Sequence, residues 1–201
     1  MARQAAGRGR LIAVEGTRGR DVRDASAELW RQLRARKAHG GVSRWDASGI
    51  FNELRLGKRK HLSLSPRVLV LLYAADLVFR LRWEIRPGLE QGHVVVAAPY
   101  VETAVALGVA SGLPHSWLTG LFRFAPPPDA CYRARERGKA SNGKVKPLDG
   151  YGEFCGAILA VGVAPATRAG LRQQMVAYLE KLESQKRCLP LTRRVISAQR
   201  P

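Results

Sequence analysis

The sequence predicts an α/β fold in which helices cover both faces of a parallel sheet. Short apolar runs that suit buried strands alternate with longer segments whose apolar residues recur every three or four positions. The 201 residues are 46% apolar, enough to bury one sizeable core, so we expect a single domain over residues 1–201. In such sheets ligands bind beyond the carboxyl ends of the strands.

The first part of the chain predicts a strand, a helix and a second strand. Residues 11–14 form a short apolar run that leads into a glycine-containing turn, as a buried parallel strand would. Residues 21–38 carry apolar side chains at steps of three and four with arginines between them, which predicts an amphipathic helix with a basic outer face. Residues 41–46 supply the second strand.

The middle of the chain predicts a long helix and a central strand. Ser65 followed by Pro66 is a strong helix start, because serine caps the first turn and proline suits the first helical position. Residues 68–75 are apolar on every side, so we expect the beginning of this helix to be buried. We expect Pro87–Gly88 to end it and residues 93–98 to form a central strand.

The remainder of the chain predicts further helices, a loop and a last strand. Residues 129–150 are basic, contain Gly and Asn and lack apolar periodicity, so we interpret them as a mobile, lid-like loop. The other expected elements are helices over residues 102–110, 116–124 and 168–186 and a final strand over residues 194–198.

The charge is unbalanced. Lys and Arg outnumber Asp and Glu by 34 to 16, a formal net charge of +18. Such a field attracts polyanions, acidic proteins or anionic lipid surfaces without selecting among them. Weak, unspecific polyanion or nucleic-acid binding through the basic loop and the basic run 55–60 is the corresponding expectation, although exposed charge runs are usually only solvated.

Cysteine use and hydropathy indicate a soluble, cytoplasmic protein. Three cysteines, Cys131, Cys155 and Cys188, are too widely spaced for a metal motif and cannot all pair within the chain, so we expect reduced, buried thiols. No secretory signal is recognisable, no apolar run approaches the length of a membrane span, and no histidine has metal-ligand spacing. We assign no metal ligand and expect no membrane association.

Four stretches of the chain resemble thymidylate kinases in order and character. They are residues 11–23 (LIAVEGTRGRDVR), 65–86 around LLYAAD, 86–103 (RPGLEQGHVVVAAPYVET) and 117–129 (WLTGLFRFAPPPD). The resemblance covers nearly the whole chain and implies a P-loop NTPase-type parallel sheet flanked by helices on both faces. It also implies that the turn after the first strand is the phosphate loop.

The chain departs from this family at its chemical positions. A phosphate loop needs a second glycine, a lysine for the β and γ phosphates and a hydroxyl for Mg²⁺, but these places hold Asp21, Val22 and Arg23. The family's Asp-Arg pair after the central strand is replaced by Ala98–Pro99, and its substrate-binding arginine by Leu77. Phosphoryl transfer depends on positioning and charge neutralisation, so these joint losses predict an inactive enzyme.

The resemblance nevertheless marks candidate site residues, none of them assigned a catalytic role. Tyr73 matches the aromatic residue that stacks on thymine in the family, although on an apolar helix it is more often core. The candidates are the phosphate-loop remnant Glu15, Gly16, Thr17, Arg18, Gly19, Arg20 and Arg23, the nucleoside-pocket residues Tyr73 and Tyr100, and the lid residues Arg133, Arg135, Arg137 and Lys139.

Two function classes follow from the sequence. The first is a pseudokinase that keeps the fold as an interaction or regulatory module for a protein partner or an oligomer, with no cofactor. The second is a divergent dTMP or polyphosphate kinase that takes phosphate from a nucleotide and uses arginines for the missing lysine. Only the second class calls for ATP and Mg²⁺.

Overall fold

The computed structural model describes residues 8–51, 53, 65–134, 165–185 and 187–191. Five parallel strands make one sheet in the order β2-β3-β1-β4-β5. The strands are β1 (Arg10–Glu15), β2 (Gly40–Arg44), β3 (Val94–Ala98), β4 (Ala130–Arg133) and β5 (Leu189–Pro190). The predicted α/β class and parallel sheet are confirmed.

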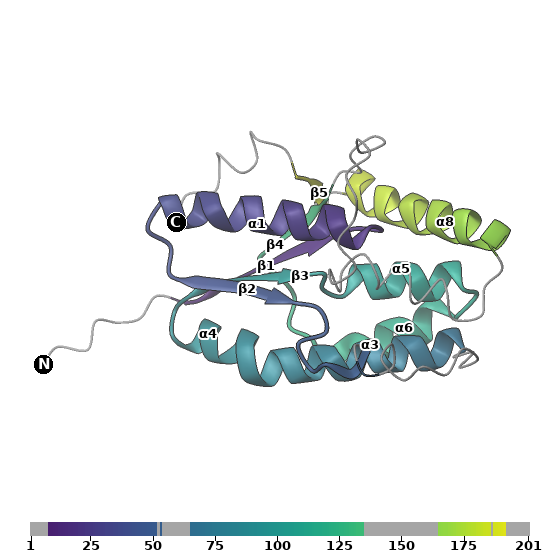
Figure 1. Ribbon diagram of the computed structural model, residues 1–201, viewed down its shortest axis with the longest axis horizontal. Helices are drawn as coiled ribbons and strands as arrows, with labels where there is room; N and C mark the ends of the chain where they lie inside the picture. Colours follow the sequence, from purple (N-terminus) through teal and green to yellow (C-terminus); the bar gives the residue numbers. More distant parts are fainter. Residues whose placement is uncertain (1–7, 52, 54–64, 135–164, 186, 192–201) are drawn as a thin grey trace, which may run out of the picture.

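Helices lie on both faces of the sheet (Figure 1). Helix α1 (Gly19–Ala35) covers one face, and the continuous run of α3 (Pro66–Arg80), η1 (Leu81–Ile85) and α4 (Arg86–Glu90) covers the other. Beyond the carboxyl ends of the strands lie α5 (Glu102–Ala110) and α8 (Pro165–Ser184), which pack on each other. The remaining described segments are α6 (His115–Leu121) and the short η2 (Phe122–Phe124).

The long helix does not end where the sequence predicts. Pro87–Gly88 lies inside α4, directly after the π-helical turn η1, and a proline there removes only one backbone donor. The helix ends at Glu90 and is followed by a turn in which Gly92 has φ +76° and His93 N–H donates to Gly88 O at 2.9 Å. This is the glycine-terminated helix end that the left-handed conformation favours.

The beginning of the same helix is also different from the prediction. Ser65 caps it as expected, since its hydroxyl accepts from Val68 N–H at 3.3 Å. Leu69, Val70 and Tyr73 are buried, but Val68 and Leu71 are exposed. The expectation of a helix buried on all sides at its beginning is therefore wrong.

The lid-like loop begins later than the sequence predicts. Residues 130–133 form β4, which pairs in parallel with β1. In this pair Ile12 lies beside Ala130 and Glu15 beside Arg133. The four-residue strand is too short to display a periodicity that sequence inspection can detect. The predicted loop after residue 134, the basic run 55–60 and the predicted strand 194–198 lie outside the described residues.

Two of the three cysteines form a disulfide, which corrects the expectation of reduced thiols. Tyr132 stands opposite Leu189 in the β4–β5 pair, so the residues just before them, Cys131 and Cys188, are neighbours across the strands. Their Cα atoms lie 4.6 Å apart, within the usual range for a disulfide. Cys155 lies outside the described part of the chain. No helix of the described residues has the length and apolar character to cross a bilayer.

Candidate functional site

The turn between β1 and α1 is short. Only Gly16, Thr17 and Arg18 separate the end of β1 from the first residue of α1, Gly19. Val22 N–H donates to Arg18 O at 3.1 Å, a bond of the first helical turn. The backbone N–H of Val22 is therefore committed to the helix and does not point out of the turn.

Val22 fills the inside of this turn. Its side chain is buried, and a Cβ placed on Gly16 would lie 2.7 Å from Val22 Cγ2. Gly16 is therefore needed because the valine packs directly over the backbone. Where the family resemblance calls for a lysine that reaches phosphates, the structure has an apolar contact that belongs to the core.

Glu15 joins the end of β1 to the start of α5. Its carboxylate accepts from Glu102 N–H at 3.0 Å, from Thr103 N–H at 3.0 Å and from Thr103 Oγ1–H at 2.6 Å. Tyr100 N–H donates to the same carboxylate at 3.2 Å. Complete burial raises the pKa of Glu15, an effect that the bonds from Thr103 partly offset. This carboxylate thus holds together the two strands between which ligands bind in such sheets.

Arg80 occupies the end of β3 from the other side. The guanidinium is fully buried and donates to Pro99 O, Ser43 O and Ser43 Oγ at 2.9, 2.9 and 3.0 Å. Ser43 Oγ–H in turn donates to Glu84 at 2.6 Å. The Arg80 guanidinium therefore lies close to Ala98–Pro99, where the resemblance calls for an Asp-Arg pair. Its N–H groups donate to Ser43 and Pro99 of the protein itself.

Asp76 ties down the segment after β2. Its carboxylate accepts from Asp46 N–H at 3.1 Å, Ser48 N–H at 2.9 Å and Ser48 Oγ–H at 2.8 Å. Sequence reasoning missed both Asp76 and Arg80 as individual residues. Charged residues within an otherwise apolar helix were the available signal, because such residues are buried only when paired.

Both nucleoside-pocket candidates are core residues. The Tyr73 hydroxyl donates to Tyr100 O, and its ring meets Phe122 edge-on with centroids 6.0 Å apart. The Tyr100 hydroxyl donates to Pro126 O at 2.8 Å, and burial raises the pKa of that phenol. The structure brings the two tyrosines together, but each is nearly inaccessible to solvent.

The remaining loop candidates are spread over the turn. Thr17 and Gly19 are buried, Arg18 is the N-cap residue of α1, and Arg20 is exposed. Arg23 is half-buried and lies 3.4 Å from Asp24. An arginine cannot ligate a cation, and Ala98 offers no carboxylate, so these residues do not fit Mg²⁺. In the described part of the chain no cluster of acidic, His or Cys side chains is placed to hold a metal ion.

Arg133 is not a lid residue. It lies at the end of β4 and donates two hydrogen bonds to Glu183 of α8 at 2.8 and 2.9 Å. It also forms a salt bridge with Glu180, in which Nη1 and Oε1 are 3.6 Å apart. It therefore connects the sheet to a helix. The other three lid candidates, Arg135, Arg137 and Lys139, lie outside the described residues.

A cavity of about 630 Å³ lies beside β1 and β4. Tyr100, Phe122 and Tyr132 line it together with residues 126–128 and Arg187.

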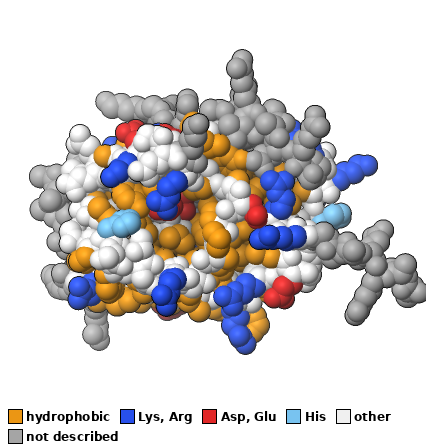
Figure 2. All heavy atoms as spheres, turned by 180° about the vertical axis from the view of Figure 1, so that it is seen from behind, with side chains coloured by type: hydrophobic (Ala, Val, Ile, Leu, Met, Phe, Trp, Pro, Cys, Tyr) orange, Lys and Arg blue, Asp and Glu red, His pale blue; other side chains and the backbone are white. Residues whose placement is uncertain are grey.

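Seen from behind, the molecule has hydrophobic side chains over the centre of this view, with scattered Lys and Arg around them (Figure 2). Of the phosphate-loop candidates only Glu15 contributes to the cavity lining.

Known proteins are similar to this chain in sequence and in fold. It is 27% identical over 158 residues to the probable thymidylate kinase 2 of Saccharolobus solfataricus, covering 75% of this chain and 74% of the relative. It is 31% identical over 119 residues to the probable thymidylate kinase of Pyrobaculum calidifontis, covering 59% of this chain and 60% of the relative. No protein-family model matches the chain.

The crystal structure of thymidylate kinase from Ehrlichia chaffeensis has the same fold, with a TM-score of 0.65 over 90% of this chain and 89% of that chain at 13% identity. The sheet, its helices and the turn after β1 define the class as a P-loop NTPase-type α/β protein. Within that class, the chain is similar in sequence to probable thymidylate kinases and in fold to a thymidylate kinase.

Proposed function

We propose that this protein is a non-catalytic member of its family, a pseudokinase that acts through interactions with other proteins. The observation that carries the proposal is the closed turn after β1. Helix α1 begins at Gly19, and Val22, at the position where the resemblance calls for a lysine, packs over Gly16. Phosphoryl transfer relies on preorganised positive groups around the phosphates, and valine supplies none.

The residues around the strand ends support the same proposal. The end of β3 holds a buried Ala98, and the guanidinium of Arg80 donates to Ser43 and Pro99. Tyr73 and Tyr100 use their hydroxyls within the core. Binding a nucleotide in this crevice would break contacts that the folded chain makes on its own, and their cost would reduce the affinity.

The test is a phosphoryl-transfer assay with ATP, dTMP and Mg²⁺, accompanied by thermal shift measurements with each ligand and with polyphosphate. We expect no turnover above the control without enzyme and no rise in melting temperature. A ligand present at 100 times its dissociation constant would stabilise the fold by ~2.7 kcal/mol, which such a measurement resolves easily. Turnover that disappears on chelation of Mg²⁺ would overturn the proposal.

The alternative, an arginine-based kinase, makes the opposite prediction. It requires Arg18, Arg20 and Arg23 to replace the missing lysine at the amino end of α1. If the wild type shows turnover and the triple Ala variant of these arginines loses it, the alternative is supported. A residual activity that the triple variant retains identifies a contaminating kinase.

A further inference from the structure

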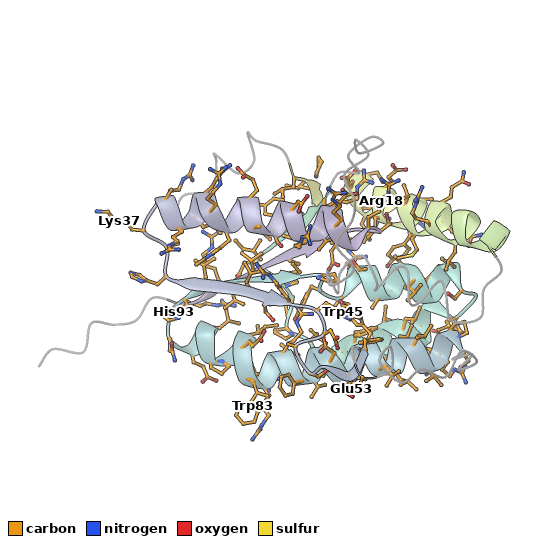
Figure 3. The ribbon with its side chains drawn as sticks, viewed as in Figure 1. Arg18, Lys37, Trp45, Glu53, Trp83 and His93 are labelled. Atoms are coloured by element: carbon orange, nitrogen blue, oxygen red, sulfur yellow. A yellow bond between two sulfur atoms is a disulfide. The ribbon has the colours of Figure 1, made fainter. Side chains whose placement is uncertain are left out.

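The cavity of about 630 Å³ beside β1 and β4 follows the length of β1. Arg10, the first residue of that strand, and Glu15, the last, both line it. Figure 3 shows the two ends of the sheet, with His93 at the amino ends of the strands and Arg18 beyond their carboxyl ends. The cavity thus extends along the whole strand and is not confined to the edge of the sheet where ligands usually bind in this fold.

The disulfide joins two walls of this cavity. Cys131 lines it from β4, while Arg187 and Leu189, the residues on either side of Cys188, line it from the segment that follows α8. The covalent bond between Cys131 and Cys188 therefore holds segment 187–191 against the sheet at the border of the cavity.

Segment 187–191 has few other contacts that would keep it on the sheet. Strand β5 within it has two residues, and one of them, Pro190, has no N–H to donate to a neighbouring strand. Leu191 N–H donates to Arg133 O at 3.0 Å just after the strand. Leu189 is 42% exposed, so it buries little apolar area. The disulfide is consequently the main link between this segment and β4.

Helix α8, in contrast, is held in place without the disulfide. Arg133 donates two hydrogen bonds to Glu183, and Leu179 is buried where α8 packs on α5. The ion pair between Arg187 and Glu102, 3.4 Å long, contributes little because the Arg187 side chain is largely exposed. Loss of the disulfide would therefore release segment 187–191 while α8 stays on α5.

The two sulfur atoms differ in accessibility. Cys131 is half-buried and lines the cavity, whereas Cys188 is only 1% exposed. Thiol–disulfide exchange requires that a thiolate reach one sulfur of the bond. Attack from the cavity is therefore expected at the sulfur of Cys131.

We propose that the Cys131–Cys188 disulfide is a thiol–disulfide exchange site whose reduction by a dithiol releases segment 187–191 and opens the cavity. One thiolate of the dithiol attacks Sγ of Cys131, and Cys188 leaves as a thiolate that takes up a proton. The second thiolate attacks the reductant's own sulfur in the mixed disulfide, so Cys131 also leaves as a thiolate and is protonated. The dithiol is oxidised to a disulfide, and its two electrons and two protons end on the two cysteines.

Reduction has a structural consequence beyond the bond itself. Tyr132, which is 2% exposed in the oxidised protein, lies opposite Leu189 in the β4–β5 pair. Once segment 187–191 leaves, Tyr132 and the apolar lining around Phe122 become accessible to an apolar ligand. This inference goes beyond the proposed function, because it concerns a site on β4 and does not require the protein to be inactive.

The direct test is amide hydrogen exchange of the full chain before and after reduction with dithiothreitol, without denaturant. Cys155→Ser serves as the background, because it removes the third cysteine as a competing thiol. We expect amides of segment 187–191 and of β4 to exchange about tenfold faster or more after reduction, while those of β3 keep their rates. Unchanged exchange in segment 187–191, or equal acceleration in β3, overturns the proposal.

The double variant Cys131→Ser/Cys188→Ser provides the matched comparison. It should show the fast exchange without reductant and no response to dithiothreitol, whereas Cys155→Ser alone should respond like the wild type. Binding of the apolar dye anilinonaphthalene sulfonate should raise its fluorescence about twofold or more in the reduced protein and in the double variant. A double variant that is unfolded by circular dichroism overturns the proposal, because the bond would then support the whole fold.

The rate of reduction gives an independent readout. Alkylation and mass spectrometry follow the two thiols as they form in dithiothreitol at increasing urea. We expect reduction in the absence of urea at a rate that does not follow the unfolded fraction. Reduction only when the whole protein unfolds overturns the proposal. Phosphoryl transfer measured on the same samples tests the proposed function separately, because turnover would contradict the pseudokinase role and leave the exchange result unchanged.

Discussion

The crevice at the ends of β1 and β3 differs from the outer face of α3 and η1 in the kind of side chain that it buries. In the crevice the charged side chains Glu15 and Arg80 are fully buried, and the protein supplies their hydrogen-bond partners. On the outer face, Leu71 and Trp83 remain exposed although they are apolar. The charged groups at the usual ligand position of this fold are thus hydrogen-bonded within the protein, while the outer face of α3 and η1 exposes apolar side chains to solvent.

This contrast follows from the different costs of unsatisfied groups. A buried charge without partners is expensive, so Glu15 and Arg80 can be buried only because the chain supplies their hydrogen-bond partners. An exposed apolar side chain costs less and gains free energy only when a partner covers it.

Arg80→Ala should have the largest effect on stability. The change removes the donors to Ser43 O and Pro99 O and leaves a cavity, so we expect the free energy of unfolding to fall by about 3–5 kcal/mol. Arg82→Ala, the same change two positions away in exposed η1, is the control and should cost at most about 0.5 kcal/mol. Urea unfolding measures both. Equal losses would mean that the Arg80 guanidinium reaches solvent.

Glu15→Gln should cost about 1–3 kcal/mol, because the amide nitrogen would face a backbone N–H donor. The loss should depend on pH. Since burial raises the pKa of Glu15, the folded protein holds this proton more tightly than the unfolded chain. The wild type's advantage over the variant should therefore be greatest below the ordinary pKa of about 4.5 and shrink as the pH rises above it. A loss that grows with pH would mean that the hydrogen bonds outweigh burial.

The closed turn can be tested by a double-mutant cycle. Gly16→Ala places a Cβ 2.7 Å from Val22 Cγ2, and we expect a cost of about 1–3 kcal/mol from overpacking. Val22→Ala alone should cost about 1–2 kcal/mol. Because the second change removes the clash, the combined loss should be smaller than the sum by about 1 kcal/mol. Strict additivity would show that valine does not pack over the glycine.

The smallest effect is expected on the outer face. Leu71→Ser should change the free energy of unfolding by no more than about 0.5 kcal/mol, because the side chain has no core contact to lose. Leu77→Ser, in the buried row of the same helix, is the matched control and should be strongly destabilising. If both variants lose the same stability, the outer face of α3 is covered in the free protein.

The fold was largely predictable because periodicity and turn residues report local structure. The runs at residues 11–14 and 93–98 became β1 and β3. The helix predicted over residues 168–186 corresponds to α8, whose buried side chains include Leu171, Met175 and Leu179. Pro87–Gly88 misled because a proline that follows a π-helical turn does not break the helix. The terminator was Gly92, which only its left-handed backbone identifies.

The site was less predictable because its contacts join distant segments. The sequence marked Glu15, Tyr73 and Tyr100, but it did not indicate that Thr103 would bind the first, or that Arg80 would reach Ser43. The disulfide depended on the register of two short strands, which composition does not encode. The apolar residues at 68–75 predicted a buried helix, and only the packing of the helix shows that Val68 and Leu71 face solvent.

The bond between Cys131 and Cys188 closes a covalent ring that contains the intervening stretch of chain, a sequence separation of 57 residues. A protease that cuts once between these two positions therefore opens the ring without dividing the molecule. The two fragments stay joined through sulfur and run as one species on a denaturing gel until a thiol reductant separates them. An unchanged molecular mass on a non-reducing gel therefore does not show that the chain is uncut, and the gel must be run under reducing conditions to show it.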